Sequence, residues 1–285
     1  MTKDIRDKKI MSKMKLLAPE EIFSPEDDRD FHQEDVMKAT LILPEEYLAP
    51  QTPILNQGTV GSCVAHALAT CLAQGQEAIF EASDNFSRGF IYANRGEKDW
   101  KGPGMVSREA LKQLNKCGDV LYKDFPYNKE YPGITAKFDG DKNLKNLLQK
   151  AAPYAILNYF RCYTPEEIKA TIVNYGAVFI AVDIYDGFGR NVELPKQGEK
   201  SHGGHAMTIV GWTKDNKWIV QNSWGKLWGD RGKCYMPFDY PIKESWGITI
   251  NQHVKPKKHY SWYVRIWNWI KSLFKKIENN KKESN

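Results

Sequence analysis

Apolar residues recur at helical spacing through the first half of the chain. After Ser62, small and apolar residues predominate without a proline, which predicts a helix that starts near Ser62 and ends between residues 75 and 80. Similar spacing over residues 86–92 and 108–114 predicts two further helices, and Gly118 is placed to end the second of them. The first half is therefore predicted to be mainly helical.

The second half changes to short runs of β-branched and apolar residues. Thr164, Pro165 and two glutamates open a predicted helix through residue 174, with Thr164 as its N-cap. Strands are predicted over residues 155–159, 177–184, 206–212, 217–222, 232–236 and 247–251, and the third and fourth form a hairpin. A helical half followed by an antiparallel half predicts an α+β fold with two lobes.

The 285 residues divide into three parts by composition. Residues 1–48 are polar and mixed in charge, with three prolines, and we expect a solvated arm or a short leader. Residues 49–250 form the predicted folded domain, with a first lobe over 49–154 and a second over 155–250. Residues 251–285 form a basic tail.

Charge and cysteine content exclude several classes of protein. The net charge of +6 comes from the tail, which holds nine Lys and Arg against two Glu, so residues 1–250 carry a net −1 and binding of nucleic acid is not expected. The five cysteines are too few for a disulfide framework, and no cluster has metal-ligand spacing. We expect no metal and no cofactor. Without a signal-like run or about 18 consecutive apolar residues, the default location is the cytoplasm.

Candidate chemistry begins at Cys63. Gly58 and Gly61 loosen the approach, Ser62 stands at the N-cap position, and Cys63 follows in the first turn of the predicted helix. Unpaired N–H groups and the helix dipole favour a thiolate there. A single cysteine is more often an inert buried residue, so the reading requires a base elsewhere in the chain.

His205 is the candidate base. It opens a predicted strand behind Gly204, and Asn222 ends the paired strand seventeen residues later, where its amide oxygen can accept the imidazole N–H. Trp224 can cover that bond. Gln57 can place a side-chain N–H beside the Cys63 backbone N–H as an oxyanion hole. Each residue alone has an ordinary structural explanation, but together they supply the four roles that acyl transfer needs.

The local strings resemble the papain-like cysteine peptidases. They are Gln57-Gly-x-x-Gly-Ser-Cys63, Gly204-His205-Ala206, and Asn222-Ser-Trp-Gly225 followed by Trp228-Gly229. The resemblance covers about residues 50–250 and includes the Phe-Pro-Tyr turn at 125–127. It implies a helical lobe, a β-barrel-like lobe, a cleft between them and a polypeptide substrate. It also implies Cys63 as nucleophile, His205 as general acid and base, Asn222 as orienting residue and Gln57 as oxyanion donor.

Substrate-binding residues are carried over more loosely. Gly102 and Gly104 resemble the glycines that bind the substrate backbone in this family, and Gly204 and Trp224 flank the catalytic pair. The chain departs from the family pattern at three places. Val60 replaces a disulfide cysteine, Val64 replaces a tryptophan and His66 replaces a phenylalanine. His66 lies on the same helix as Cys63, so we interpret it as a modulator at most.

The tail adds a second feature. Apolar residues over 260–277 form a helical stripe flanked by Lys and Arg, with three tryptophans. This pattern is typical of a helix lying on a membrane surface or against a partner protein, and it fits equally a helix folded back on the domain.

Three functions therefore remain open. The first is an active thiol peptidase of a bacterial or phage type with a short leader. The second is a thiol hydrolase acting on a non-protein amide such as a peptidoglycan cross-link. The third is a membrane-binding or partner-binding protein that acts through the tail with a vestigial peptidase lobe.

Overall fold

The computed structural model describes residues 21–24, 27, 30–32, 43–95, 103–127 and 144–253. Gly102 and the predicted tail helix at 260–277 lie outside these ranges. Within them, no helix has the length and apolar character needed to cross a membrane.

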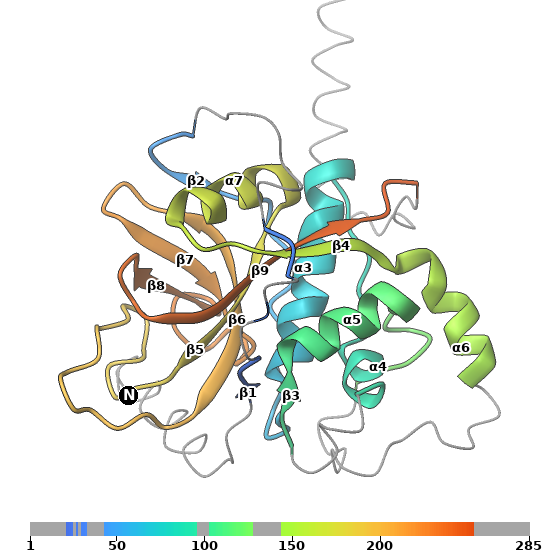
Figure 1. The fold of residues 1–285 in the computed structure, drawn as a ribbon, viewed down its shortest axis with the longest axis horizontal. Coiled ribbons are helices and arrows are strands. Elements are labelled where there is room, and N and C mark those ends of the chain that lie inside the picture. Colours follow the sequence, from blue (N-terminus) through green and yellow to red (C-terminus); the bar gives the residue numbers. More distant parts are fainter. Residues whose placement is uncertain are drawn as a thin grey trace, which may run out of the picture.

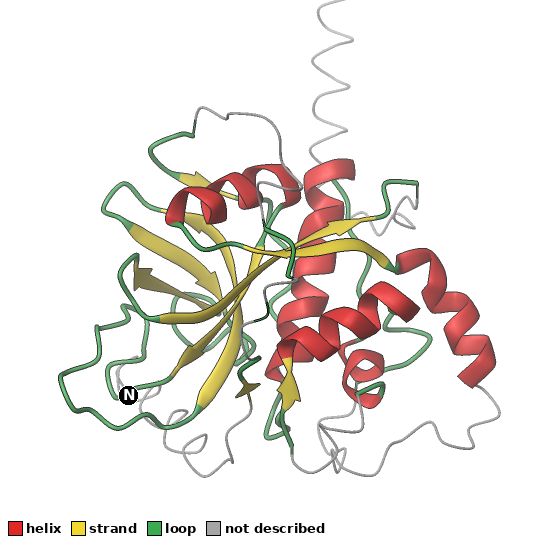
Figure 2. Ribbon diagram, viewed as in Figure 1, coloured by secondary structure: helices red, strands yellow, loops and turns green. Residues whose placement is uncertain are grey.

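The helices are α3 (Cys63–Phe80), α4 (Arg88–Ala93), α5 (Ser107–Cys117), α6 (Leu144–Ala151) and α7 (Pro165–Tyr175), with a 3₁₀ turn at Ala152–Tyr154. Helices α3, α4, α5 and α6 gather in one half of the molecule, whereas α7 lies beside the sheet in the other half (Figures 1 and 2). The predicted helix at 62–80 is confirmed, and it runs through Gly75 without a break. The helix predicted over 86–92 begins only at Arg88, because the Ser87 side chain caps it by accepting from Phe90 N. Helix α6 has no counterpart among the helices predicted from the sequence.

Helix α7 begins and ends as its sequence predicts. Thr164 Oγ1 accepts from Glu167 N, and the Glu167 carboxylate accepts from Thr164 N in return, which is a complete capping box. Gly176 ends the helix in the left-handed region (φ 85°). A Cβ at this position would lie 2.3 Å from the carbonyl oxygen of Gln74 on α3, so glycine is needed for both conformation and space.

The second half of the chain supplies most of an antiparallel sheet. Its strands are β4 (Ile156–Arg161), β5 (Val178–Asp183), β6 (Gly204–Trp212), β7 (Lys217–Gln221), β8 (Lys233–Pro237) and β9 (Ile242–Ile250). Their order is β4-β9-β5-β6-β7-β8, and β2 (Tyr47–Leu48) pairs with β6. The predicted hairpin is confirmed as β6 and β7, with Thr208 opposite Gln221. Strand β9 begins earlier than the predicted start at residue 247.

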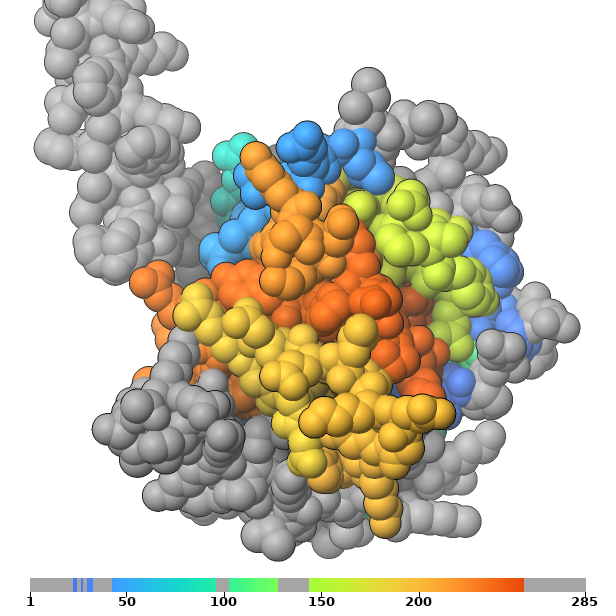
Figure 3. All heavy atoms as spheres, turned by 90° about the vertical axis from the view of Figure 1, so that its left-hand side faces the viewer, coloured from blue at the N-terminus to red at the C-terminus, as the bar shows by residue number. Residues whose placement is uncertain are grey.

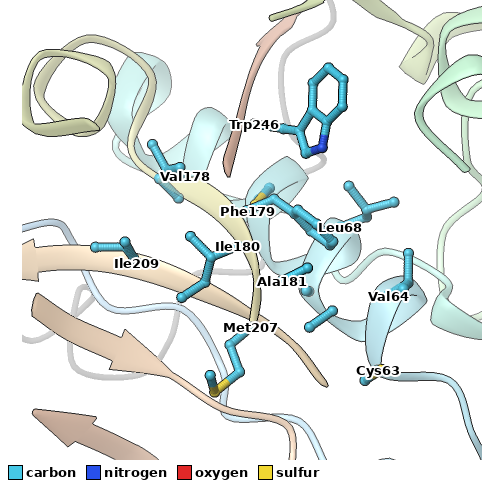
Figure 4. Close-up of a cluster of buried hydrophobic side chains, with 14 of the residues drawn as sticks. Cys63, Val64, Leu68, Val178, Phe179, Ile180, Ala181, Met207, Ile209 and Trp246 are labelled. Carbon is cyan, nitrogen blue, oxygen red and sulfur yellow. The ribbon is translucent and has the colours of Figure 1, made fainter. Parts of the chain in front are cut away.

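Helix α3 lies between the sheet and helices α4 and α5, and it forms the centre of the core (Figure 1). Figure 4 shows Val64 and Leu68 of α3 beside Phe179 and Ala181 of β5, all fully or almost fully buried. Figure 3 shows the side of the molecule that carries the sheet. Residues from the second half of the chain form most of this side. These features confirm the predicted α+β architecture.

Parts of the segment before residue 48 pack on the domain. Strand β1 (Glu21–Ile22) pairs in parallel with β3 (Met105–Val106) and also lies against β6. Ser24 is buried, and the Asp30 side chain is only 7% exposed. Composition favours a solvated arm here, but Asp30 is buried because arginines from remote segments neutralise it.

Candidate active site

Cys63 is the first residue of α3 (Figure 4). It has no exposed surface, and Ser62 precedes it at the N-cap position. Ser62 holds the predicted N-cap position, but its hydroxyl makes no capping hydrogen bond to a backbone N–H of α3. Its oxygen instead lies 2.8 Å from the phenol oxygen of Tyr127. Cys63 therefore has its predicted place at the helix start, while Ser62 is engaged with another segment.

His205 and Asn222 meet at one end of the β6–β7 hairpin. The imidazole Nε2 of His205 lies 2.8 Å from Asn222 Oδ1. The backbone N–H of Ser223 donates to the same oxygen at 2.7 Å, which establishes it as the acceptor, so Nε2 is the donor. In a neutral His205 ring the basic lone pair is then on Nδ1.

Trp224 covers the His205 ring. The two ring centroids are 4.7 Å apart with an interplanar angle of 30°. Trp228 packs edge-on against Trp224 at 5.0 Å, and Phe188 contacts both tryptophans. His205 and Asn222 are each 2% exposed, so their hydrogen bond is shielded from water and is stronger for it.

Gln57 is joined to the segment that follows Asn222. Its backbone N–H donates to Ser223 O at 2.9 Å, and the Ser223 hydroxyl donates to Gln57 Oε1 at 2.5 Å. The side-chain Nε2 donates to Val60 O at 3.0 Å. A carboxamide nitrogen carries two hydrogens, so this bond does not use all of its donor capacity.

These bonds connect the start of α3 with the start of β6. Gln57 is bonded to Ser223, whose neighbour Asn222 is bonded to His205. Farther along the same two elements, the Thr208 hydroxyl donates to Ala67 O at 3.1 Å. The structure thus brings together the helix that carries Cys63 and the predicted base, orienting and oxyanion residues.

The four predicted substrate-binding residues have different surroundings. Gly104 is buried next to β3, and its carbonyl accepts from Arg95 Nη1 at 3.4 Å. Gly204 is half-buried at the start of β6, opposite Asp183, and Trp224 lies over His205. Gly102 is outside the described ranges. Their roles toward a substrate stay predictions.

Burial makes three of the other described cysteines unsuited to catalysis. Burial raises the pKa of the Cys71 and Cys162 thiols to about 12, and it also raises the pKa of Cys234. Cys117 is half-buried near Gln113. Among the described residues, no group of three or more His, Cys, Asp and Glu is placed to hold a metal ion.

Two residues of this site, Ser223 and Tyr127, are not among those predicted from the sequence. Ser223 orients Gln57, and Tyr127 contacts both Ser62 and Gln57. The sequence places Tyr127 only in the Phe-Pro-Tyr turn at 125–127. Its link to the Cys63 loop had no sequence signal, because the partners are more than sixty residues apart.

A sequence model described as papain family cysteine protease matches residues 45–254. The chain belongs to the papain family of cysteine proteases. The observed fold agrees, since the crystal structure of xylellain, a cysteine protease from Xylella fastidiosa, superposes with a TM-score of 0.68 at 25% identity. That match covers 80% of this chain and 94% of xylellain. A procathepsin B from Trypanosoma congolense has the same fold, with a TM-score of 0.66 at 16% identity over 85% of this chain and 89% of that one.

Curated relatives of this papain-family chain match it over a smaller part of its length. An uncharacterized peptidase C1-like protein of Acanthamoeba polyphaga mimivirus is 28% identical over 67% of this chain and 66% of its own length. A cysteine protease of Blomia tropicalis is also 28% identical, over 65% of this chain and 57% of its own length. The chain thus spans just under two thirds or less of the length of these relatives.

Proposed function

We propose that this papain-family chain is a thiol peptidase that hydrolyses peptide bonds through an acyl-enzyme at Cys63. The observation that carries the proposal is the buried hydrogen bond from His205 Nε2 to Asn222 Oδ1 under Trp224, linked through Ser223 to the loop before Cys63. It fixes the tautomer in which His205 Nδ1 exchanges protons. The family membership makes a polypeptide the expected substrate.

In the first half of the proposed reaction, the Cys63 thiolate attacks the carbonyl carbon and a sulfur–carbon bond forms. The carbonyl oxygen becomes an oxyanion that accepts from Gln57 Nε2 and the Cys63 backbone N–H. When the intermediate collapses, the carbon–nitrogen bond breaks and His205 Nδ1–H protonates the leaving amine.

In the second half, His205 Nδ1 takes a proton from water as the water oxygen attacks the thioester. The carbon–sulfur bond then breaks, the acid product leaves, and the thiolate and imidazolium are restored. Asn222 keeps the ring in position through both halves. The Trp224 ring keeps water from competing for the Asn222 oxygen.

Thiol alkylation at pH 6 tests the proposal. An ordinary thiol with a pKa of about 8.5 is less than about 1% ionised there and reacts slowly. Because Cys63 has no exposed surface, a small reagent such as iodoacetamide needs the least movement of the chain to reach it. The half-buried Cys117 provides a reference thiol in the same molecule.

We expect peptide mapping to show Cys63 labelled about a hundredfold faster than Cys117, and this advantage to be lost in His205→Ala. Cys63→Ala should keep its circular dichroism spectrum and lose all turnover of a peptide library. Equal labelling rates of the two thiols, unchanged in His205→Ala, would contradict the proposed ion pair.

The non-protein amide remains the alternative substrate, since the chemistry would be the same. A panel that pairs peptides with peptidoglycan fragments separates the two, and we expect turnover of the peptides. The predicted membrane or partner surface at 260–277 lies outside the described residues, and a variant lacking residues 255–285 tests whether turnover depends on it.

A further inference from the structure

A chain of buried hydrogen bonds runs behind the loop before Cys63. His66 Nδ1 lies 2.8 Å from Ser62 O and 3.2 Å from Ser62 Oγ. Ser62 Oγ lies 2.8 Å from Tyr127 Oη, which in turn lies 2.7 Å from Gln57 O. These four residues are between 0% and 8% exposed, and the mechanism above assigns no role to His66, Ser62 or Tyr127.

The chemistry of the atoms sets the direction of every bond. A carbonyl oxygen can only accept, so His66 Nδ1 donates to Ser62 O and Tyr127 Oη donates its single hydrogen to Gln57 O. Tyr127 therefore accepts from the Ser62 hydroxyl. Donation runs from His66 to Ser62, from Ser62 to Tyr127, and from Tyr127 to Gln57.

These hydrogen bonds hold both ends of the segment from Gln57 to Cys63, which we call the oxyanion loop. Gln57 carries the side-chain donor of the proposed oxyanion hole, and Ser62 is bonded through its own peptide to the backbone donor of Cys63. Val60 O, between them, accepts from Gln57 Nε2 at 3.0 Å and from Ser62 N at 2.8 Å. The separation of the two oxyanion donors therefore depends on Tyr127 and His66 as well as on the loop itself.

Packing and hydrogen bonds restrict the position of Tyr127. The Ser87 hydroxyl donates to Phe125 O in the same turn. Gly89 of α4 approaches so closely that a Cβ there would lie 3.2 Å from Tyr127 Cα. The His66 ring packs edge-on against the Tyr127 ring, with centroids 4.7 Å apart and planes at 86°. The phenol thus has little freedom to move away from Gln57.

We propose that His66, Ser62 and Tyr127 are positioning residues that set the spacing of the two oxyanion donors. The inference rests on the proposed function. It assigns the histidine at position 66 to the oxyanion hole and not to proton transfer with Cys63.

The test compares two reactions of the same thiol in the full chain. Iodoacetamide loses iodide from a saturated carbon and forms no oxyanion, so its rate reports the thiolate alone. Peptide hydrolysis needs the thiolate and the oxyanion hole. We expect Tyr127→Phe to lower kcat by about tenfold to a hundredfold, because a misplacement of about 1 Å costs about a hundredfold. KM and the alkylation rate should stay within twofold.

Variants at His66 separate donation from packing. In His66→Asn the side-chain nitrogen lies two bonds beyond Cβ, as Nδ1 does in histidine, so it can donate to Ser62 O and kcat should stay within a few-fold of wild type. His66→Leu keeps bulk without a donor and should lose about tenfold. Tyr235→Phe, on the edge strand β8, is the matched control, since it removes a phenol bond of 2.8 Å to Asp230 and should leave kcat unchanged.

Three results would overturn the inference. One is a Tyr127→Phe variant with wild-type kcat. Another is equal loss of kcat and alkylation rate, which would mean that the thiolate or the fold is damaged. The third is His66→Asn as slow as His66→Leu. A wild-type Cys63 that iodoacetamide does not label would overturn the proposed function itself, and this inference with it.

Discussion

Replacing Asp30 by alanine should destabilise the protein more than any exposed charge substitution. Its carboxylate accepts from Arg108 Nε at 2.9 Å and also bonds Arg108 Nη2, and Arg161 Nε lies 3.5 Å away. The three side chains are only 6–7% exposed. Arg108 belongs to α5 and Arg161 to β4, so Asp30 joins a helix of the first lobe to a strand of the second.

The magnitude follows from what remains after the carboxylate is removed. A buried ion pair that loses one partner costs about 3–5 kcal/mol, because the other charge is left without compensation. Arg161 would keep Glu244, 3.8 Å from its Nη1, and the face of Trp246, 4.1 Å from its guanidinium carbon. Asp30→Ala should therefore lie near the lower limit, about 3 kcal/mol. For a domain of this size that corresponds to a fall in Tm of about 6–12 °C.

Urea unfolding followed by tryptophan fluorescence measures the free energy. Glu109→Ala is the matched control. Glu109 lies on α5, the helix that carries Arg108, and its Oε1 is 2.9 Å from Lys112 Nζ on the exposed side. Losing this pair should cost less than about 1 kcal/mol. In a double-mutant cycle with Arg108→Met, the double variant should be about 2 kcal/mol more stable than the sum of the single effects. An Asp30→Ala cost no larger than that of Glu109→Ala would refute the reasoning.

Three further predictions concern the site and the core. Asn222→Ala should lower kcat by about a hundredfold and leave measurable turnover, since it removes orientation of His205 and no reacting group; full activity would count against this role. Gly176→Ala should destabilise by at least about 1–3 kcal/mol in urea unfolding, because of the positive φ and the 2.3 Å approach to Gln74 O, and an unchanged midpoint would be inconsistent with that packing. Burial raises the pKa of Cys71 from 9.0 to about 12, so the unfolded chain loses this proton first and stability falls as pH rises above 9. Cys71→Ala should lessen that fall by up to about 1.4 kcal/mol per pH unit between pH 9 and 11 in urea titrations, and parallel curves for the two proteins would contradict the assignment.

Short-range features of the fold were predictable from the sequence. The start of α3 at Cys63, the capping box at Thr164 and the glycine end of α5 follow from residues within four positions of each helix end. The β6–β7 hairpin was predictable from two apolar runs and a short turn. Because the hairpin brings its own ends together, it also made the contact of His205 with Asn222 predictable.

Contacts between remote segments were decided by the tertiary structure alone. The Ser62 hydroxyl was expected to cap its own helix, but it bonds to Tyr127, 65 positions away. Ser223 reaches Gln57 across 166 positions, and Asp30 is buried only where Arg108 and Arg161 converge on it.

The physical reason is the range of the forces that act on each group. A cap or a hairpin competes only with water, so local residues decide it. A buried hydroxyl or carboxylate must find a partner wherever the packed chain provides one. The sequence therefore determined which residues carry the proposed chemistry and on which elements they lie. Packing decided which neighbours hold them in position.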